Sequence, residues 1–323
     1  MSRKSDKKPK SSSAGDTSAG RWAGRAAWAI AAAVLVAGGA LVFSRLEDRV
    51  LNGQVGQAPR VVRVELAERP AWMPAALAGL IARQVLPAEA HYYDSRLVEH
   101  VRAASARCPW VRRVVNVEKY PAAEPGVAVV EVRAEFRMPV ARVGMGPDFA
   151  YVDAEGVRLP AGEVPRWAGL NDDGSATYYL DRGDVPRGRR YSRIHYITIE
   201  GVSAAAPPVG QRWEGEDLAS GLRLTALVAT RPYAHEITAI DVRNHGGRVC
   251  SDEPQLRMYA QMDQGSPTDI RFGRFPLPGG DYVVSPARKL AYLDEYVQDH
   301  DGRLAGLNRY IDLRYDELHV SFN

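Results

Sequence analysis

The sequence predicts an α+β protein in which a transmembrane helix precedes two folded regions. The first region follows the order β-α-α-β-β, and the second is a mostly antiparallel β domain with flanking helices. An uncharged stretch near the N-terminus, two segments of helical spacing between alternating ones, and the many later alternating segments predict this class. We expect the chain to divide into 1–25, 26–43, 44–60, 61–141 and 142–323.

The charge balance gives little support to a nucleic-acid-binding role. The chain has 323 residues, with 42 Lys and Arg against 39 Asp and Glu, and a formal net charge of +3. Much of the positive excess lies in residues 1–25, whereas nucleic-acid binders usually carry it on a folded face. This segment has almost no large apolar side chains, so we expect a disordered basic tail.

Residues 26–43, AAWAIAAAVLVAGGALVF, form the predicted membrane span because they contain no charged residue. As a helix they reach about 27 Å, near the lower limit for crossing a bilayer core. A cleaved signal peptide is the alternative, but the apolar run is long for one and no small-x-small cleavage site follows. The Lys and Arg before the span place the N-terminus in the cytoplasm and the later domains outside it.

A polar linker over 44–60 leads into the first folded region. The expected elements are a strand over 61–66, a helix beginning at Pro74, a second helix capped by Asp94 and ending before Pro109, a strand over 111–117 and a strand over 127–136. We expect Val111, Val115 and Val117 to share one face of their strand. Trp110, which follows the second helix, is expected to fill the core.

This order and three motifs resemble the bacterial cell-division family FtsQ, called DivIB in some bacteria. CPWVRRVVNVEKYP (108–121) is similar to the family's Pro-Trp-Val, alternating strand and aromatic-Pro pair. Pro139-Val140-Ala141 matches the end of a later strand, and Asp153 with Gly156 matches an Asp-x-x-Gly. The resemblance implies that 61–141 is a POTRA domain and that 142–323 is the family's β domain.

The second region mixes strands with two helices. The expected strands cover 194–202, 236–244 and 255–262, and the expected helices cover 215–230 and 285–300. Ser285 is the expected N-cap of the last helix, with Pro286 in its first turn. Residues 160–195 match nothing in the family, and their role stays open.

The chain ends on a strand, YIDLRYD (310–316), that resembles the closing strand of FtsQ. Alternation puts Ile311, Leu313 and Tyr315 on one face, and the phase reverses near Asp316–Glu317, which predicts a bulge or turn there. In the family this terminal strand receives a partner segment. The resemblance therefore implies partner-binding residues Tyr310, Asp312, Arg314 and Tyr315, with Leu290 and Tyr292 on the preceding helix.

No catalytic or metal motif is found in the sequence. HExxH and GxSxG are missing, and LPGGD (277–281) lacks the Lys-Ser/Thr of a phosphate loop. The best polar cluster, His235-Glu236 with Asp241 and His245, is interpreted as a solvated edge. We expect no catalytic residue, metal, cofactor or small-molecule substrate. The sequence does not decide whether Cys108 and Cys250 pair.

The resemblance implies a non-catalytic, single-pass protein of the cytoplasmic (inner) membrane, enriched at the division septum. It would link early and late division proteins by binding FtsB- and FtsL-like membrane proteins through its C-terminal edge strand. Two alternatives stay open. One is a POTRA-containing envelope-assembly scaffold unrelated to septation, and the other is a membrane-anchored cell-wall enzyme.

Overall fold

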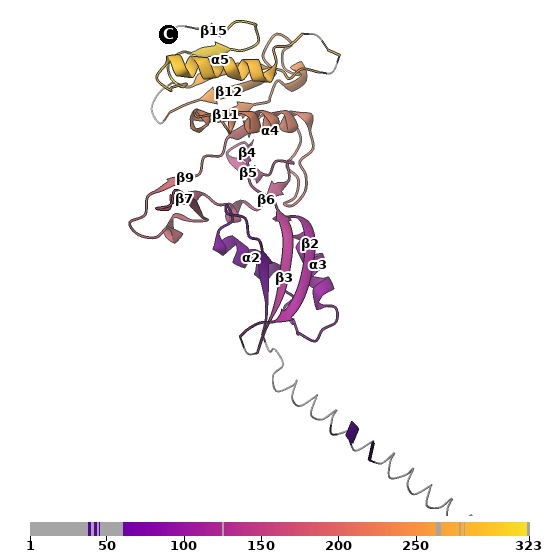
Figure 1. The fold of residues 1–323 in the computed structure, drawn as a ribbon. Helices are drawn as coiled ribbons and strands as arrows, with labels where there is room; N and C mark the ends of the chain where they lie inside the picture. The colour runs from indigo at the N-terminus through magenta and orange to yellow at the C-terminus, as the bar shows by residue number, and fades with distance from the viewer. Residues whose placement is uncertain are drawn as a thin grey trace, which may run out of the picture. The chain divides into compact units, whose positions relative to one another are not determined.

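The computed structural model describes residues 61–124, 126–262, 266–277, 279–280 and 282–321, with 38, 39, 42, 43 and 45. It divides into two units, Met1–Pro59 and Arg60–Asn323, and the second contains helices and several sheets, which confirms the α+β class (Figure 1). The predicted tail, most of the predicted span and nearly all of the linker lie outside the described residues. Within the described part of the chain, no helix is long and apolar enough to cross a membrane.

The first folded region has the predicted β-α-α-β-β order. Its elements are β1 (Val61–Ala67), α2 (Ala75–Val85), α3 (Leu97–Arg107), β2 (Val111–Pro121) and β3 (Val127–Phe136). The strand order is β1-β3-β2, with β1 parallel and β2 antiparallel to β3. Pro74 precedes the first residue of α2, as predicted. The N-cap of α3 is Arg96 and not Asp94, whose side chain instead accepts a bond from the Arg96 amide.

One prediction for β2 is wrong. Val111 and Val117 are buried, but Val115 is 49% exposed. The pairing register of β2 against β3 shifts between Val111 and Arg113 and again between Val114 and Asn116. Each irregularity changes which face the following side chains occupy, so simple alternation along the strand fails at Val115.

Trp110 fills the core of this region, as predicted, and is fully buried. Its indole Nε1 donates a 2.7 Å hydrogen bond to Glu163, which lies in the later part of the chain. Tyr151, Leu159 and Val164 also belong to this core. Residues on both sides of the predicted division after residue 141 therefore share one apolar cluster.

The largest sheet has nine strands in the order β15-β14-β13-β12-β11-β10-β4-β5-β6. They are β4 (Ala141–Met145), β5 (Asp148–Val152), β6 (Arg158–Leu159), β10 (Thr198–Glu200), β11 (Ile237–Asp241), β12 (Leu256–Ala260), β13 (Thr268–Gly273), β14 (Tyr310–Asp312) and β15 (His319–Val320). Pairing is parallel at β4–β10, β10–β11 and β13–β14 and antiparallel elsewhere.

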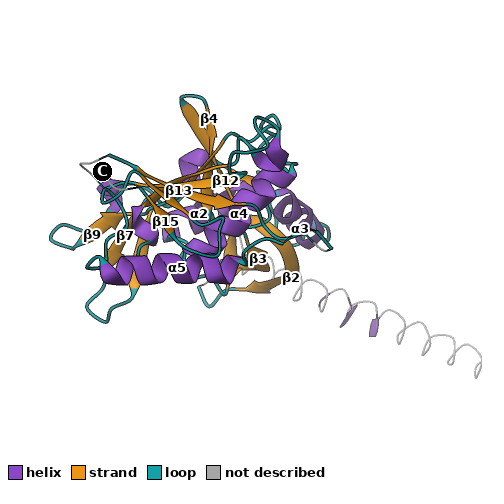
Figure 2. Ribbon diagram, turned by 90° about the horizontal axis from the view of Figure 1, so that it is seen from above, coloured by secondary structure: helices purple, strands orange, loops and turns teal. Residues whose placement is uncertain are grey.

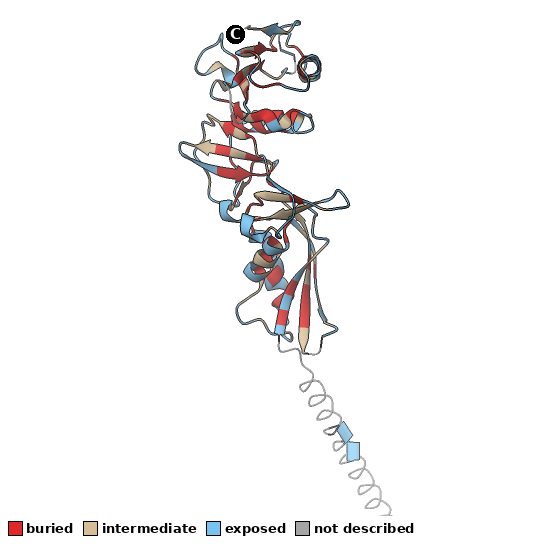
Figure 3. Ribbon diagram, turned by 90° about the vertical axis from the view of Figure 1, so that its left-hand side faces the viewer, coloured by how far each residue is buried: buried red, intermediate tan, exposed pale blue. Residues whose placement is uncertain are grey.

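Two helices bury apolar faces in the core of this sheet, α4 (Glu216–Val228) and α5 (Pro286–Asp299) (Figure 2). The hydroxyl of Ser285 accepts a hydrogen bond from the Arg288 amide, and Pro286 is the first residue of α5, as predicted. In Figure 3, buried residues are concentrated on the central strands of the nine-stranded sheet and on α4.

Residues 160–195, for which the sequence offered no role, contain a separate small sheet. It consists of β7 (Trp167–Leu170), β8 (Ala176–Tyr179) and β9 (Tyr191–Arg193) in the order β8-β7-β9. The two cysteines do not pair, because Cys108 is buried, Cys250 is exposed and both are free thiols. Burial raises the pKa of the Cys108 thiol.

Candidate binding site at the C-terminal edge of the sheet

β14 is an internal strand of the large sheet. It runs parallel to β13, and Ile270 lies opposite Ile311. The amide of Leu313 continues the ladder with a 3.0 Å bond to the carbonyl of Arg271. Ile311, Asp312 and Leu313 are all buried, so both faces of the strand are covered. Asp312, expected from the resemblance to bind a partner, is therefore covered within the protein.

After β14 the chain reverses direction. Residues 314–317 form bends, and β15 then returns antiparallel to β14, with Asp312 opposite His319. This turn is the one that the phase change in the sequence predicted. Asp316 is held from two sides, since Tyr282 donates to its carboxylate at 2.7 Å and the hydroxyl of Tyr292 donates to its carbonyl.

β15 forms the C-terminal edge of the nine-stranded sheet, and no other strand of the described chain covers it. The amide of Ser321 donates to the carbonyl of Tyr310 at 3.2 Å. In an antiparallel ladder, hydrogen-bonded and non-hydrogen-bonded pairs alternate, so the neighbouring pair Ile311–Val320 is non-hydrogen-bonded. The N–H and C=O of Val320 consequently point away from β14, toward the open edge.

A groove of about 570 Å³ lies between α5 and this edge. Its lining residues are Arg288, Tyr292, Glu295, Tyr296, Asp299, His300, Asn308, Asp316, Glu317, Leu318 and Val320. Leu318, Val320 and the tyrosine rings supply apolar surface. The lining contains four carboxylates against one arginine and one histidine, which makes the groove acidic at neutral pH.

Lys289 fixes α5 to the end of β13. Its ammonium is buried and donates to the carbonyls of Phe272 at 2.6 Å and Arg274 at 3.1 Å, and it lies 4.4 Å from the centroid of the Phe272 ring. Burial lowers the pKa of Lys289 to about 8. The helix that forms one wall of the groove is thus held by a buried cation.

Arg314 is an internal partner of the sheet. Its guanidinium binds the Asp312 carboxylate and also donates to the carbonyl of Asp252 at 2.9 Å. The hydrogen bond to Asp312 raises the pKa of Arg314. Gly273 permits this arrangement, because a Cβ at that position would lie 2.9 Å from the Arg314 side chain.

The structure brings only some of the predicted partner-binding residues to the surface. Leu290 is 1% exposed and Asp312 3%, so both are part of the interior. Tyr310 is half-buried, with the Arg271 guanidinium 4.0 Å from its ring centroid. Tyr292 lines the groove, and Tyr315 is 51% exposed.

Sequence reasoning missed the residues that form the edge itself. Leu318 and Val320 line the groove, and Val320 turns its main-chain groups outward. Their reversed phase relative to Ile311 and Leu313 was visible in the sequence, and it signals a separate strand that returns along β14. The acidic wall formed by Glu295 and Asp299 carries no comparable signal.

The polar cluster considered from the sequence does not come together. The Glu236 carboxylate is buried and accepts the amides of Leu304 and Ala305 at 3.1 and 2.7 Å. Asp241 accepts the Arg243 amide at 2.7 Å, and His245 pairs with the Ser220 hydroxyl at 3.0 Å. Among the described residues, no three His, Cys, Asp or Glu side chains are placed so that they could hold a metal ion together.

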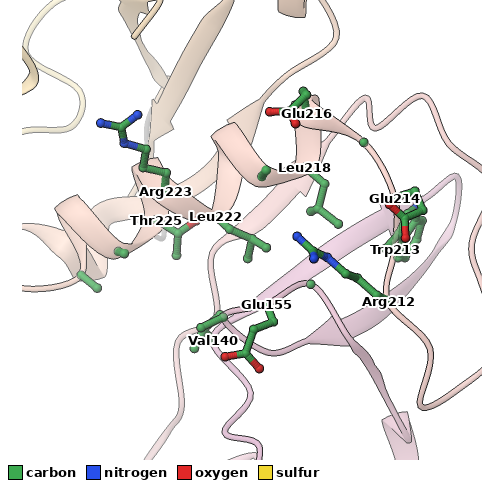
Figure 4. Close-up of a pocket in the computed structure, with 16 residues that line it drawn as sticks. Val140, Glu155, Arg212, Trp213, Glu214, Glu216, Leu218, Leu222, Arg223 and Thr225 are labelled. Carbon is green, nitrogen blue, oxygen red and sulfur yellow. The ribbon is translucent and has the colours of Figure 1, made fainter. Parts of the chain in front are cut away.

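A second hollow, of about 380 Å³, lies under α4. Figure 4 shows Leu218 and Leu222 of α4 pointing toward Val140 and Glu155, with the Arg212 side chain reaching between them. The Glu155 carboxylate already binds Arg112 and Arg137, both at 2.9 Å. The hollow therefore presents an apolar floor without a free carboxylate at Glu155, and we assign it no chemistry.

No protein-family model matches this chain, and no curated protein matches it.

Proposed function

We propose that this protein is a non-catalytic membrane scaffold of bacterial cell division, of the FtsQ/DivIB type. It binds FtsB- and FtsL-like membrane proteins by adding a partner strand to β15. The observation that carries the proposal is the open main-chain edge at Val320 beside an elongated groove along α5. An unpaired edge offers main-chain hydrogen bonds to a partner strand, and the adjacent groove selects its side chains.

The fold of the first region supports the proposal. The β1-α2-α3-β2-β3 order with a three-stranded sheet is the order expected of a POTRA domain over 61–141, followed by a β domain over 142–323. The Asp-x-x-Gly motif also has a structural reason. Asp153 accepts the amides of Glu155 and Val157 at 3.0 and 2.8 Å, and Gly156 adopts a φ of +77°, which favours glycine.

The charge of the groove defines the partner segment. Glu295, Asp299, Asp316 and Glu317 give the walls a negative potential, and Leu318 with Val320 gives an apolar strip beside the edge. A segment that fits is extended, carries Lys or Arg toward α5 and turns apolar side chains toward β15.

The proposed membrane anchor determines where binding occurs. A span over 26–43 with a short basic tail in the cytoplasm places both folded regions outside the inner membrane. Partners that are themselves membrane-anchored then meet the chain in two dimensions, which raises their effective concentration. The first region, 61–141, would supply a second docking surface.

Depletion of the protein in its own cell tests the division role. A fluorescent fusion is expected at midcell, and depletion is expected to give filaments without septa while chromosome segregation continues. Normal septation on depletion, together with uniform membrane fluorescence of a functional fusion, contradicts the division role and favours an envelope-assembly scaffold instead.

A further inference from the structure

The small sheet β8-β7-β9 has an open edge at β9. Within the part of the chain that the structure describes, β9 pairs only with β7, and all three of its residues are exposed. The amide of Leu170 donates to the Arg190 carbonyl, and the amide of Ile194 donates to the Arg166 carbonyl. By antiparallel alternation, Ser192 turns its main-chain groups to β7, whereas Tyr191 and Arg193 turn theirs outward.

The same edge carries cations that no described carboxylate neutralises. Arg187, Arg190 and Arg193 are exposed, and no salt bridge in the described residues joins any of them to a carboxylate. Arg166 differs, because it pairs with Asp181. Three unpaired guanidiniums within seven residues create a local positive potential.

The strand is held in shape by aromatic packing. The rings of Trp167 and Tyr191 meet edge to face at 5.7 Å, and the Arg182 guanidinium lies 5.6 Å from the Tyr191 centroid. Gly169 leaves room for Tyr179, since a Cβ there would lie 3.1 Å from the tyrosine ring. A strand that is ordered before binding loses little conformational entropy when a partner docks.

We propose that the β9 edge binds an extended acidic segment of a partner protein by strand addition. Main-chain bonds form to Tyr191 and Arg193. Because Arg190 and Arg193 differ by an odd number of residues and lie on opposite faces, carboxylates on both faces of the segment pair with Arg187, Arg190 and Arg193. The charge of the edge selects an anionic partner. An anionic membrane fits less well, because a lipid surface offers no main-chain groups to pair with the outward N–H and C=O of Tyr191 and Arg193.

The test uses the full-length chain in nonionic detergent and a fluorescent peptide of glutamate and threonine that carries glutamates at both odd and even positions. Fluorescence anisotropy is expected to show binding that weakens with added salt. The Arg187→Gln/Arg190→Gln/Arg193→Gln variant is expected to lose about tenfold in affinity, since each exposed ion pair contributes modestly. The matched control, Arg83→Gln/Arg96→Gln/Arg107→Gln, removes the same charge from exposed positions on and beside α2 and α3 and should bind like the parent.

Amide hydrogen exchange separates strand addition from simple charge attraction. The glutamate peptide is expected to slow exchange at Tyr191 and Arg193 and to leave Ser192, already bonded to β7, unchanged. Three results overturn the proposal. A lysine–threonine peptide could bind as tightly as the glutamate peptide, or the triple arginine variant could keep the parental affinity together with a parental circular dichroism spectrum. The third such result is binding of the glutamate peptide without slower exchange at Tyr191 and Arg193. Binding of phosphatidylglycerol vesicles in place of the peptide, with the same arginine dependence, also overturns it and identifies a membrane contact.

Discussion

Arg314 holds the buried carboxylate of Asp312 from two nitrogens. Its Nε lies 3.0 Å from Oδ1 and its Nη2 lies 2.8 Å from Oδ2. The Asp312 side chain is only 4% exposed. The residue that the sequence pointed to as a partner contact is thus a structural support of β14, and removing it leaves a buried charge without its main partner.

Substituting Arg314 is therefore expected to destabilise the fold. Arg314→Leu should lower the free energy of unfolding by about 3 kcal/mol. The buried Asp312 carboxylate then keeps the main-chain amide of residue 314, at 3.1 Å, but its remaining salt-bridge partner is the more distant Arg271, at 3.8 Å. Urea unfolding of the full-length chain, followed by tryptophan fluorescence, measures this loss. Arg309→Leu, at an exposed position next to β14, is the matched control and should cost less than about 0.5 kcal/mol. Equal losses in the two variants would show that the Asp312 pair contributes nothing.

The acidic groove predicts a charge effect on partner binding. Glu295→Lys/Glu317→Lys reverses two exposed carboxylates of the groove and should weaken binding of the FtsB-like partner about tenfold or more. Surface-immobilised full-length chain with the soluble region of the partner gives the affinity. Glu89→Lys/Glu99→Lys makes the same charge change at exposed positions of the first region and is expected to bind as the parent does. Tighter binding of the groove variant would mean that the partner segment is acidic.

Lys289 predicts a pH dependence of stability. Its pKa is about 8 in the folded chain, whereas an unfolded lysine titrates near 10.4. Between these values the unfolded chain binds the proton and the folded chain does not, so the free energy of unfolding contributed by this group rises with pH. From pH 7.5 to pH 10 the parent should gain about 2 kcal/mol relative to Lys289→Met.

Urea midpoints of both proteins across this range measure the gain, and the variant serves as its own control for every other titrating group. Parallel pH profiles of parent and variant would refute a depressed lysine pKa, whatever the absolute stability of the variant.

Local patterns predicted the elements better than the surroundings of individual side chains. The alternation over 127–136 and the Ser285-Pro286 pair predict β3 and the start of α5, because both depend on short-range geometry. The alternation predicted a buried Val115, but register shifts between β2 and β3 leave this side chain exposed. Leu290 lies in the apolar core because α5 packs on the large sheet. The acidic groove joins α5 to residues 316–320 across a tertiary contact, and no spacing rule within one element encodes it.

Site-specific photocrosslinking in the living cell tests the central claim most directly. A photoreactive residue at Val320, on the open edge of β15, is compared with one at Phe149, which is 41% exposed on β5 near the opposite end of the strand order. Val320 is expected to crosslink to an FtsB-like single-span protein, and Phe149 is not. A Val320 position that yields no crosslink to such a protein in dividing cells, while Phe149 does, would contradict strand addition at β15.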